Sequence, residues 1–381
     1  MIKKQILVLS FITVFSLASC NGGKSSSRET ESTVIDSSTT IQTSDTSENE
    51  KTTVESTTSL ETSESSSVSP TSEEEVFDIN KIDSWFKYND VDEDILKTCI
   101  EESKEYYVGL DFTSETIKEE VAYLMQDKKG LSYDGVKNAM KITDRDWDLS
   151  PDSSDSNPFM RIIYAEYNFD ETTAAKHNDI NTIWDREHIW AKSKGGNFGT
   201  SIGPGTDIHH LRSSDKKNNN NYRNSRNFGF VENGNIGKDE KGNDSGKYSG
   251  GNTDGIYEPV DRDKGDVARA CFYMNLVYPN ACSSLTNSPV GSGNALGILD
   301  DLLEWNRMDP PDEFELRRNN LIFEKYQFNR NVFVDCPQLA DIIFKEDLIS
   351  AWKNHALFKN MQDLQGFSSK KFATSSFLVV F

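Results

Sequence analysis

A long segment near the start of the chain limits which residues can fold. From Lys24 to Glu75 roughly half of the residues are Ser or Thr, acidic side chains are scattered among them, and aromatic residues are absent. Such a composition buries too little apolar surface to offset the conformational entropy lost on folding. We therefore expect residues 20–76 to form a disordered acidic tether and residues 77–365 to form one folded domain. The remaining tail, residues 366–381, has no role that its sequence indicates.

The first twenty residues have the features of a lipoprotein signal. Two lysines precede an apolar run of about a dozen residues, and the sequence LASC ends at Cys20. Small residues directly before a cysteine are typical of a bacterial lipoprotein cleavage site, and the apolar run is too short to span a membrane. The sequence predicts that residues 1–19 are removed. Lipidated Cys20 would then anchor the protein at the extracellular face of the bacterial cell membrane.

The charge distribution restricts how this protein could bind a polyanion. The formal net charge is −21, and much of it belongs to the predicted tether. The rest of the chain is still acidic, which argues against a protein whose whole surface is positive. Any site for nucleic acid must therefore be local.

Four cysteines remain after the predicted lipidation site. A folded part of about 300 residues does not need disulfide staples, so free buried thiols are at least as well supported as disulfides. Four cysteines allow three pairings, and the sequence does not choose among them. The chain contains no CxxC pair, which is the spacing that would indicate a zinc site. The four are Cys99, Cys271, Cys282 and Cys336.

Hydrophobic periodicity predicts a mixed domain that is rich in helices. Apolar residues three and four positions apart predict amphipathic helices over residues 92–107, 114–127, 265–278, 295–308 and 313–326. The apolar and β-branched run at residues 159–169 predicts a strand. The Gly- and Asn-rich residues 241–255 predict an exposed loop.

One segment, residues 184–230, contains three of the five histidines and a run of four asparagines. Between Arg186 and Arg226 it has eight basic and three acidic residues, so it is positive in an acidic chain. The sequence predicts two strands, at residues 186–190 and 206–211, joined by a Gly-rich loop. A polar helix is expected to follow them, because Ser and Asp residues suit a helix start.

This arrangement could supply the groups that phosphodiester hydrolysis requires. Such a reaction needs a base for water, a hard cation for the phosphate charge, and oxygen ligands for that cation. Glu187 and an asparagine oxygen suit magnesium, while His188 is a workable base near neutral pH. Adjacent strand residues point to opposite faces, so Glu187 and His188 can share a site only at a strand end or an irregularity.

The motif blocks resemble a known family. WDREHIWAKS followed by DIHHLRSSDKKNNNNYRNSRNFG resembles the endonuclease I family of secreted bacterial nucleases, whose core is the ββα-metal (His-Me finger) motif. The later blocks YEPVDRDKGDVARACFYMNLVY, LLEWNRMDPPDEFELRRNNLIF and NRNVFVDCPQLADIIF extend the similarity over roughly residues 115 to 350. The resemblance implies an α+β fold, with a helix-rich domain around a ββα-metal core. It also implies metal-dependent, largely nonspecific cleavage of DNA, with RNA as a further candidate, that leaves a 5′-phosphate.

The same resemblance assigns the central roles. His188 takes the place of the general base, and Glu187 that of the carboxylate ligand of one divalent cation, Mg²⁺ or otherwise Ca²⁺ or Mn²⁺. The polar helix is one residue longer than usual, so the asparagine ligand is Asn219 when counted forward from Asp207 and Asn220 when counted back from Arg223. Asn220 is preferred, because in that count the arginine also falls into place.

Other residues of the segment receive supporting roles. Arg212 either contacts phosphate or braces the carboxylates, and it is included among the candidate catalytic residues. Of His209 and His210, one is expected to be buried and the other to lie nearer the site. We expect a monomer whose phosphate contacts are the basic residues Lys192, Lys216, Lys217 and Arg223.

A second hypothesis comes from a different functional class. The chain could be a surface lipoprotein that binds nucleic acid or metal without cutting it. Retention of Glu187, His188 and the asparagines disfavours this alternative.

Overall fold

The computed structural model describes residues 114–345, except 168–169, 197 and 289–295, together with residues 103, 106–108 and 110. The predicted signal peptide, tether and tail lie outside the described residues, as do Cys99 and most of the helix expected at residues 92–107. Within the described part, no helix is long and apolar enough to cross a membrane.

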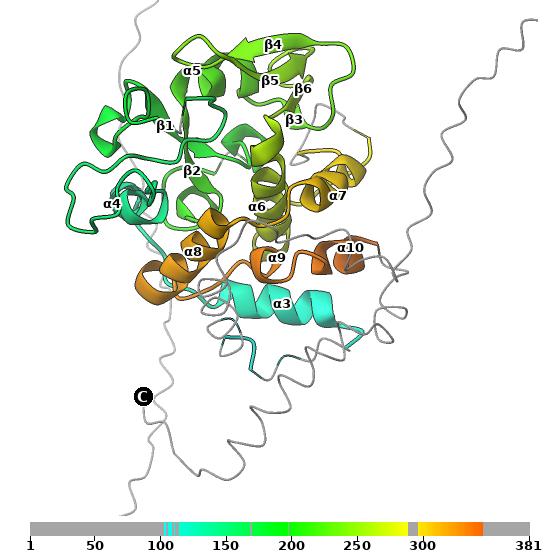
Figure 1. Cartoon of the computed structure of the whole chain (residues 1–381). Helices are drawn as coiled ribbons and strands as arrows, with labels where there is room; N and C mark the ends of the chain where they lie inside the picture. Colours follow the sequence, from blue (N-terminus) through cyan, green and yellow to red (C-terminus); the bar gives the residue numbers. More distant parts are fainter. Residues whose placement is uncertain are drawn as a thin grey trace, which may run out of the picture. The chain divides into compact units, whose positions relative to one another are not determined.

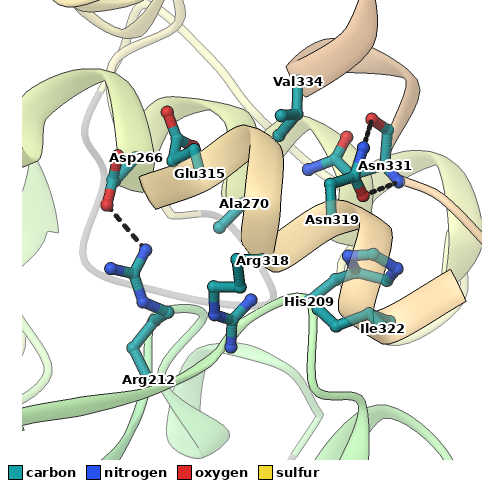
Figure 2. Close-up of a pocket in the computed structure, with 10 residues that line it drawn as sticks. All are labelled: His209, Arg212, Asp266, Ala270, Glu315, Arg318, Asn319, Ile322, Asn331 and Val334. Atoms are coloured by element: carbon teal, nitrogen blue, oxygen red, sulfur yellow. Dashed lines mark hydrogen bonds and ion pairs between the residues drawn. The ribbon is translucent and has the colours of Figure 1, made fainter. Parts of the chain in front are cut away.

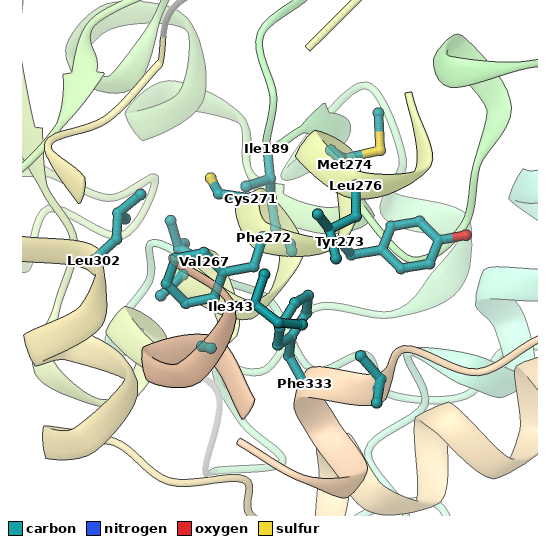
Figure 3. Close-up of a cluster of buried hydrophobic side chains, with 14 of the residues drawn as sticks. Ile189, Val267, Cys271, Phe272, Tyr273, Met274, Leu276, Leu302, Phe333 and Ile343 are labelled. Carbon is teal, nitrogen blue, oxygen red and sulfur yellow. The ribbon is translucent and has the colours of Figure 1, made fainter. Parts of the chain in front are cut away.

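The described residues form an α+β domain, which confirms the predicted fold class. Its central element is α6 (Lys264–Val277), and the main hydrophobic core surrounds this helix (Figures 1 and 3). The helices that supply the rest of this core are α3 (Ile117–Gln126), α7 (Leu299–Met308), α9 (Val332–Asp335) and α10 (Leu339–Phe344).

Two small sheets complete the domain. Strands β1 (Trp184–His188) and β2 (Leu211–Asp215) form an antiparallel pair. A four-stranded sheet has the order β3-β6-β5-β4. Its strands are β3 (Asn227–Phe228), β4 (Asn235–Lys238), β5 (Asp244–Ser249) and β6 (Ile256–Glu258).

The β1-β2 pair has a different neighbour on each face. On one face Trp184 and Leu211 pack with Val136 and Met140 of α4 (Tyr133–Thr143) in a second buried cluster. On the other face Arg212 reaches Asp266 of α6, with 2.7 Å between Nη1 and Oδ2. This placement holds the strand pair between two helices and fixes the direction of each side chain of β1.

Several predicted elements are confirmed, because their apolar periodicity matches a buried helix face. The patterns at residues 114–127, 265–278 and 295–308 correspond to α3, α6 and α7. The pattern at residues 313–326 corresponds to α8 (Glu313–Leu321) and a following π-helix, Ile322–Tyr326.

Three predictions of β-structure or loop were wrong. Of the run predicted at residues 159–169, the described residues 159–167 make only isolated bridges, because Tyr164 has a φ of 62° and donates its N–H to Asp263 instead of to a neighbouring strand. The second strand of the motif begins at Leu211, since Asp207 and the residues after it form a turn. The expected loop at residues 241–255 contains β5, which pairs with β4 on one side and β6 on the other.

Three cysteines, Cys271, Cys282 and Cys336, are free and buried. Burial raises the pKa of the Cys271 and Cys282 thiols. For these three residues the structure agrees with the expectation of free buried thiols.

A buried polar cluster around Asp207, the Asp207 hub, links the segment between β1 and β2 to α6. The Asp207 carboxylate accepts hydrogen bonds from the hydroxyl groups of Tyr273 and Tyr278, both at 2.9 Å, and from the Gln327 amide at 3.0 Å. Burial alone would raise the pKa of Asp207, but the charge of Lys128, the neighbouring His209 and the hydrogen bond from Gln327 lower it to about 2. His209 lies in the same hub, where its ring packs 4.6 Å from that of Tyr273.

Phe272 provides a test of the core around α6. Its side chain is fully buried, and its ring lies 5.5 Å from Phe333 and 5.0 Å from Phe344. We expect Phe272→Ala to lower the free energy of unfolding by about 3–5 kcal/mol, because the lost contacts leave a cavity. Urea unfolding followed by circular dichroism measures this. Tyr123→Ala, at an 80 % exposed site, should cost less than about 0.5 kcal/mol; equal losses would contradict the assigned core.

Acid should destabilise the protein through its buried histidines. Burial lowers the pKa of both His209 and His210 to about 4, from a usual 6.5. The unfolded chain therefore binds more protons than the folded one between these values. Stability is fully present above about pH 6.5 and is lost as the pH falls towards 4, by on the order of 3 kcal/mol for each histidine.

Urea unfolding from pH 7.5 to pH 4 measures this loss. A His209→Gln variant is expected to be less stable than the wild type at pH 7.5 but to decline less steeply. If the variant and the wild type lose the same free energy over this range, His209 is not a source of the acid sensitivity.

Candidate active site

The predicted site residues lie around an open cleft of about 570 Å³ along β1. Its lining comes from β1, from the polar helix after β2, and from Tyr133 of α4. The full lining is Tyr133, Asn181, Asp185, Arg186, Glu187, His188, Ala191, Lys192, Ser193, Asn219, Asn220, Asn224 and Ser225.

The position of this cleft explains how Glu187 and His188, which are adjacent on a strand, can share one site. Four consecutive residues of β1, Asp185 to His188, line the cleft although their side chains alternate between faces. The cleft must therefore follow the edge of β1 that does not pair with β2. His188 is also the last residue of β1, which places it at a strand end as the sequence required.

One nitrogen of His188 is fixed by a hydrogen bond. Its Nε2 lies 3.0 Å from the carbonyl oxygen of Gly205. A carbonyl can only accept, so Nε2 holds the proton and Nδ1 holds the lone pair. Among the described residues Nδ1 has no hydrogen-bond partner. Burial, with a smaller contribution from His210, lowers the pKa of His188 to about 3, so the ring is neutral at physiological pH.

A second histidine fixes the turn that holds His188. The backbone N–H of Trp190 donates to Nδ1 of His210 at 3.4 Å, so His210 donates from Nε2 to the Pro204 carbonyl at 2.7 Å. Pro204 precedes Gly205, the partner of His188. His210 is therefore buried but lies beside His188, with 5.5 Å between the two ring centres. His209 lies in the Asp207 hub away from the cleft.

Glu187 is a buried carboxylate with incomplete partners. It is 5 % exposed, and its Oε1 has no hydrogen-bond partner among the described residues. The nearest cation is Arg223, whose Nε lies 3.5 Å from Oε1. Burial raises the pKa of Glu187 to about 7, although Arg223 opposes this rise. A buried carboxylate oxygen without a donor is suited to a cation ligand.

The polar helix begins where the sequence predicted. Asp215 caps α5 (Lys216–Asn218), since its side chain accepts from the Asn218 N–H at 2.7 Å. Asn218 is buried, and its amide bonds to Ser245 and Tyr257 in the four-stranded sheet. From Asn219 to Arg223 the helix continues as a π-helix.

The two candidate asparagine ligands differ in how their amides are used. The Asn220 amide nitrogen donates to the Lys216 carbonyl at 2.7 Å and to Asp185 at 3.2 Å, and the residue is exposed. Asn219 is half-buried, lines the same cleft, and has no side-chain hydrogen bond in the described part of the chain. A cation would bind the amide oxygen, which has no hydrogen bond in either residue in the described part of the chain, so both asparagines remain candidate ligands, and Asn219 is the more buried of the two.

The π-helix explains why the two counts disagreed. A π-helical turn contains one residue more than an α-helical turn of the same span. Residues before the extra residue keep the forward count from Asp207, which selects Asn219. Residues after it keep the backward count from Arg223, which selects Asn220. The two counts therefore differ by the one residue that the π-helical turn adds.

Arg212 lies outside the cleft, so the structure does not support its assignment as a catalytic residue. It is 3 % exposed and forms its ion pair with Asp266, beside Arg318 and Glu315 (Figure 2). These residues line a separate pocket of about 20 Å³, which is large enough for about one water molecule. Arg212 therefore braces a carboxylate of α6 and does not face the substrate side of β1.

The predicted phosphate contacts divide into three groups. Arg223 is fully buried and donates to the carbonyl groups of Ile189 and Arg226, which does not fit a contact with nucleic acid. Lys192 is exposed and lines the cleft. Lys216 and Lys217 are half-buried and do not line the cleft; Lys216 donates to the Asn181 carbonyl and Lys217 to the Asp239 carbonyl.

Sequence reasoning missed several residues of the cleft. Asp185 and Arg186 lie within the motif but were given no role in the site. Asn181 precedes the motif, and its φ of 64° reflects a turn into β1. Tyr133 comes from α4, some fifty residues before β1, and no local pattern could have connected it to His188.

The donor set fits a hard cation. Glu187 and the Asn219 amide supply oxygen atoms, and the open cleft leaves room for water ligands. No group of three or more His, Cys, Asp or Glu side chains suited to a metal exists among the described residues. A cation at this position would therefore be held by fewer than three such side chains, with amide oxygens and waters completing its ligands.

Comparison with known proteins gives the same family as the sequence motif. The family model for endonuclease I matches residues 113–338. An extracellular ribonuclease of Bacillus amyloliquefaciens is 38 % identical over 250 residues, which cover 64 % of this chain and 79 % of the relative. An extracellular ribonuclease of Bacillus subtilis strain 168 is 39 % identical over 247 residues, covering 63 % and 78 %. No solved structure shows a significant match. The chain belongs to the endonuclease I family.

Proposed function

We propose that this protein is a secreted, metal-dependent endonuclease that hydrolyses phosphodiester bonds of nucleic acid and leaves 5′-phosphate ends. The observation that carries the proposal is the pairing of two groups in one cleft. His188 is held with its unprotonated Nδ1 available, and Glu187 lies next to it with an oxygen that no donor satisfies.

In the proposed reaction, Nδ1 of His188 accepts a proton from the attacking water. The water oxygen bonds to phosphorus while the bond from phosphorus to the 3′ oxygen breaks. The leaving 3′ oxygen takes a proton from a solvent water, which leaves a 5′-phosphate and a 3′-hydroxyl, and His188 then returns its proton to solvent. Glu187 and Asn219 would hold one divalent cation, for which Mg²⁺ is the first candidate. When bound, such a cation neutralises the charge that develops on the phosphate and on the leaving oxygen.

The supporting residues keep these groups in place. Gly205 and His210 hold the tautomer of His188, which otherwise could present either nitrogen to the water. Arg223 stands beside Glu187 and is itself fixed by backbone carbonyls. Preorganisation of this kind lowers the reorganisation needed during the reaction.

The substrate is proposed to include both RNA and DNA. The two Bacillus relatives are named as ribonucleases. The polar groups of the described cleft suit a phosphate group and a metal ion. RNA and DNA carry the same phosphate group, so these contacts do not distinguish them. Lys192 supplies positive charge in the cleft for local binding of the nucleic-acid backbone, and Lys216 and Lys217 on α5 are further candidates for phosphate contacts.

The proposed location follows from the start of the chain and from the same relatives, which are named as extracellular. Cys20 would carry the lipid, and residues 20–76 would separate a monomeric nuclease domain, residues 77–365, from the membrane surface.

Substitutions in the cleft should separate the base from the metal ligands. His188→Ala is expected to lower turnover by about two to four orders of magnitude while metal affinity stays nearly unchanged. Glu187→Gln keeps the shape of the side chain but removes its charge, so it should weaken metal binding, and high Mg²⁺ should recover part of the activity. Calorimetric metal titration and a plasmid and RNA digestion assay, each with a chelator control, measure both properties.

The neighbouring asparagines provide a matched pair for the same assays. Asn219→Ala should share the metal-dependent defect of Glu187→Gln, whereas Asn220→Ala should retain nearly wild-type metal affinity. The opposite result would assign Asn220 as the ligand. Cleavage that survives both His188→Ala and Glu187→Gln would place the site elsewhere.

The lipid anchor can be tested separately from activity. Full-length protein expressed in a bacterium should partition into the detergent phase, and Cys20→Ala should move it to the aqueous phase without changing its nuclease activity. A Cys20→Ala protein that still partitions like the wild type would refute anchoring at this residue.

A further inference from the structure

Arg186 is an arginine in the cleft that has no carboxylate partner among the described residues. It lies on the same face of β1 as His188, two residues away, and both side chains line the cleft. Several buried arginines pair with carboxylates, as Arg212 does with Asp266 and Arg269 with Glu315. Others, such as Arg145 and Arg226, are buried against backbone carbonyls. Arg186 differs from both groups because it is only half-buried and lines the open cleft beside His188, where its charge is available to a ligand.

Tyr133 fixes the orientation of this guanidinium. The centre of the Arg186 guanidinium lies 3.6 Å from the centre of the Tyr133 ring, and Nη1 donates to the Tyr133 carbonyl at 2.7 Å. The same ring lies nearly parallel to His188, with 14° between the planes and 6.0 Å between the centres. One aromatic side chain thus packs against both Arg186 and His188. The remaining N–H groups of Arg186 have no hydrogen-bond acceptor among the described residues.

We propose that Arg186 binds a non-bridging oxygen of the scissile phosphate, on the side of the cleft opposite Glu187. This inference rests on the proposed nuclease function and identifies a substrate contact within it. Glu187 and His188 point to different faces of β1, so the phosphate that they act on lies across the strand edge. Arg186 is the cation on the His188 face, and its planar fork suits phosphate oxygens. Tyr133 acts as a positioning residue for this contact.

A substrate with a single charged linkage tests the contact. The probe is an oligodeoxynucleotide in which every linkage except one is a neutral methylphosphonate, so that the scissile phosphate is the sole phosphate available. For Arg186→Met we expect kcat/KM to fall about 100-fold on this probe and by a similar factor on an ordinary oligonucleotide. Arg186→Lys keeps the charge but loses the fork and the stacking, and its loss should be smaller, about tenfold.

Two further variants control for folding and for general loss of positive charge. Arg317→Gln removes another half-buried arginine, one that stacks over Trp147 and pairs with Glu313 outside the cleft, and it should leave kcat/KM unchanged. Tyr133→Ala removes the ring that packs against Arg186 and should reproduce part of the Arg186→Met defect. Thermal unfolding of each variant shows whether it is folded.

The outcomes separate this inference from the proposed function. If folded Arg186→Met loses activity on the ordinary oligonucleotide but less than threefold on the single-phosphate probe, Arg186 contacts a neighbouring phosphate and the assignment is wrong. No loss on either substrate also overturns it. If His188→Ala remains fully active on both substrates, it is the proposed function that fails, whatever Arg186 does.

Discussion

The hydrogen bond from His188 to the Gly205 carbonyl determines what the cleft can do. A neutral imidazole can present either nitrogen, and this bond selects the one that is free to act as a base. The bond depends on a turn that only glycine permits, because a Cβ at Gly205 would lie 1.7 Å from the Gly199 carbonyl oxygen. His210 holds the preceding carbonyl of the same turn. The His188 ring is therefore oriented by a Gly-rich connection and not by the strand on which it lies.

Two unfavourable features of the fold lie at the cleft. Glu187 keeps a buried oxygen without a donor, and the helix after β2 changes from α to π at Asn219. Each departure costs stability, because unsatisfied buried groups and irregular helical turns are unfavourable. Such exceptions concentrate at functional sites, where the surrounding structure supports them. Here that support comes from Arg223, which is fully buried against backbone carbonyls, and from Asn218, which is bonded to the four-stranded sheet.

The sequence predicted features that depend on local patterns and missed those that depend on distant partners. The helices α3, α6 and α7 follow from apolar spacing, and the cap at Asp215 follows from local chemistry. The run at residues 159–169 has β-compatible residues, but Asp263, about a hundred positions away, binds its backbone. Arg212 and Arg223 read as surface charges because nothing nearby in the sequence reveals Asp266 or the carbonyl groups that bury them. Tyr133 carried no signal at all, since only the tertiary fold brings α4 to His188.

The contrast between paired and unpaired cations explains how an acidic protein could hold a polyanion. Most buried arginines here are neutralised by carboxylates, so they add little to the field outside the domain. Arg186 and Lys192 line the cleft without an ion pair among the described residues, and their charge remains available there. At physiological ionic strength charges are screened beyond about 8 Å, so the net charge of −21 acts weakly on a phosphate inside the cleft. Attraction thus depends on the few cations within that distance, and their positions matter more than the total charge of the chain.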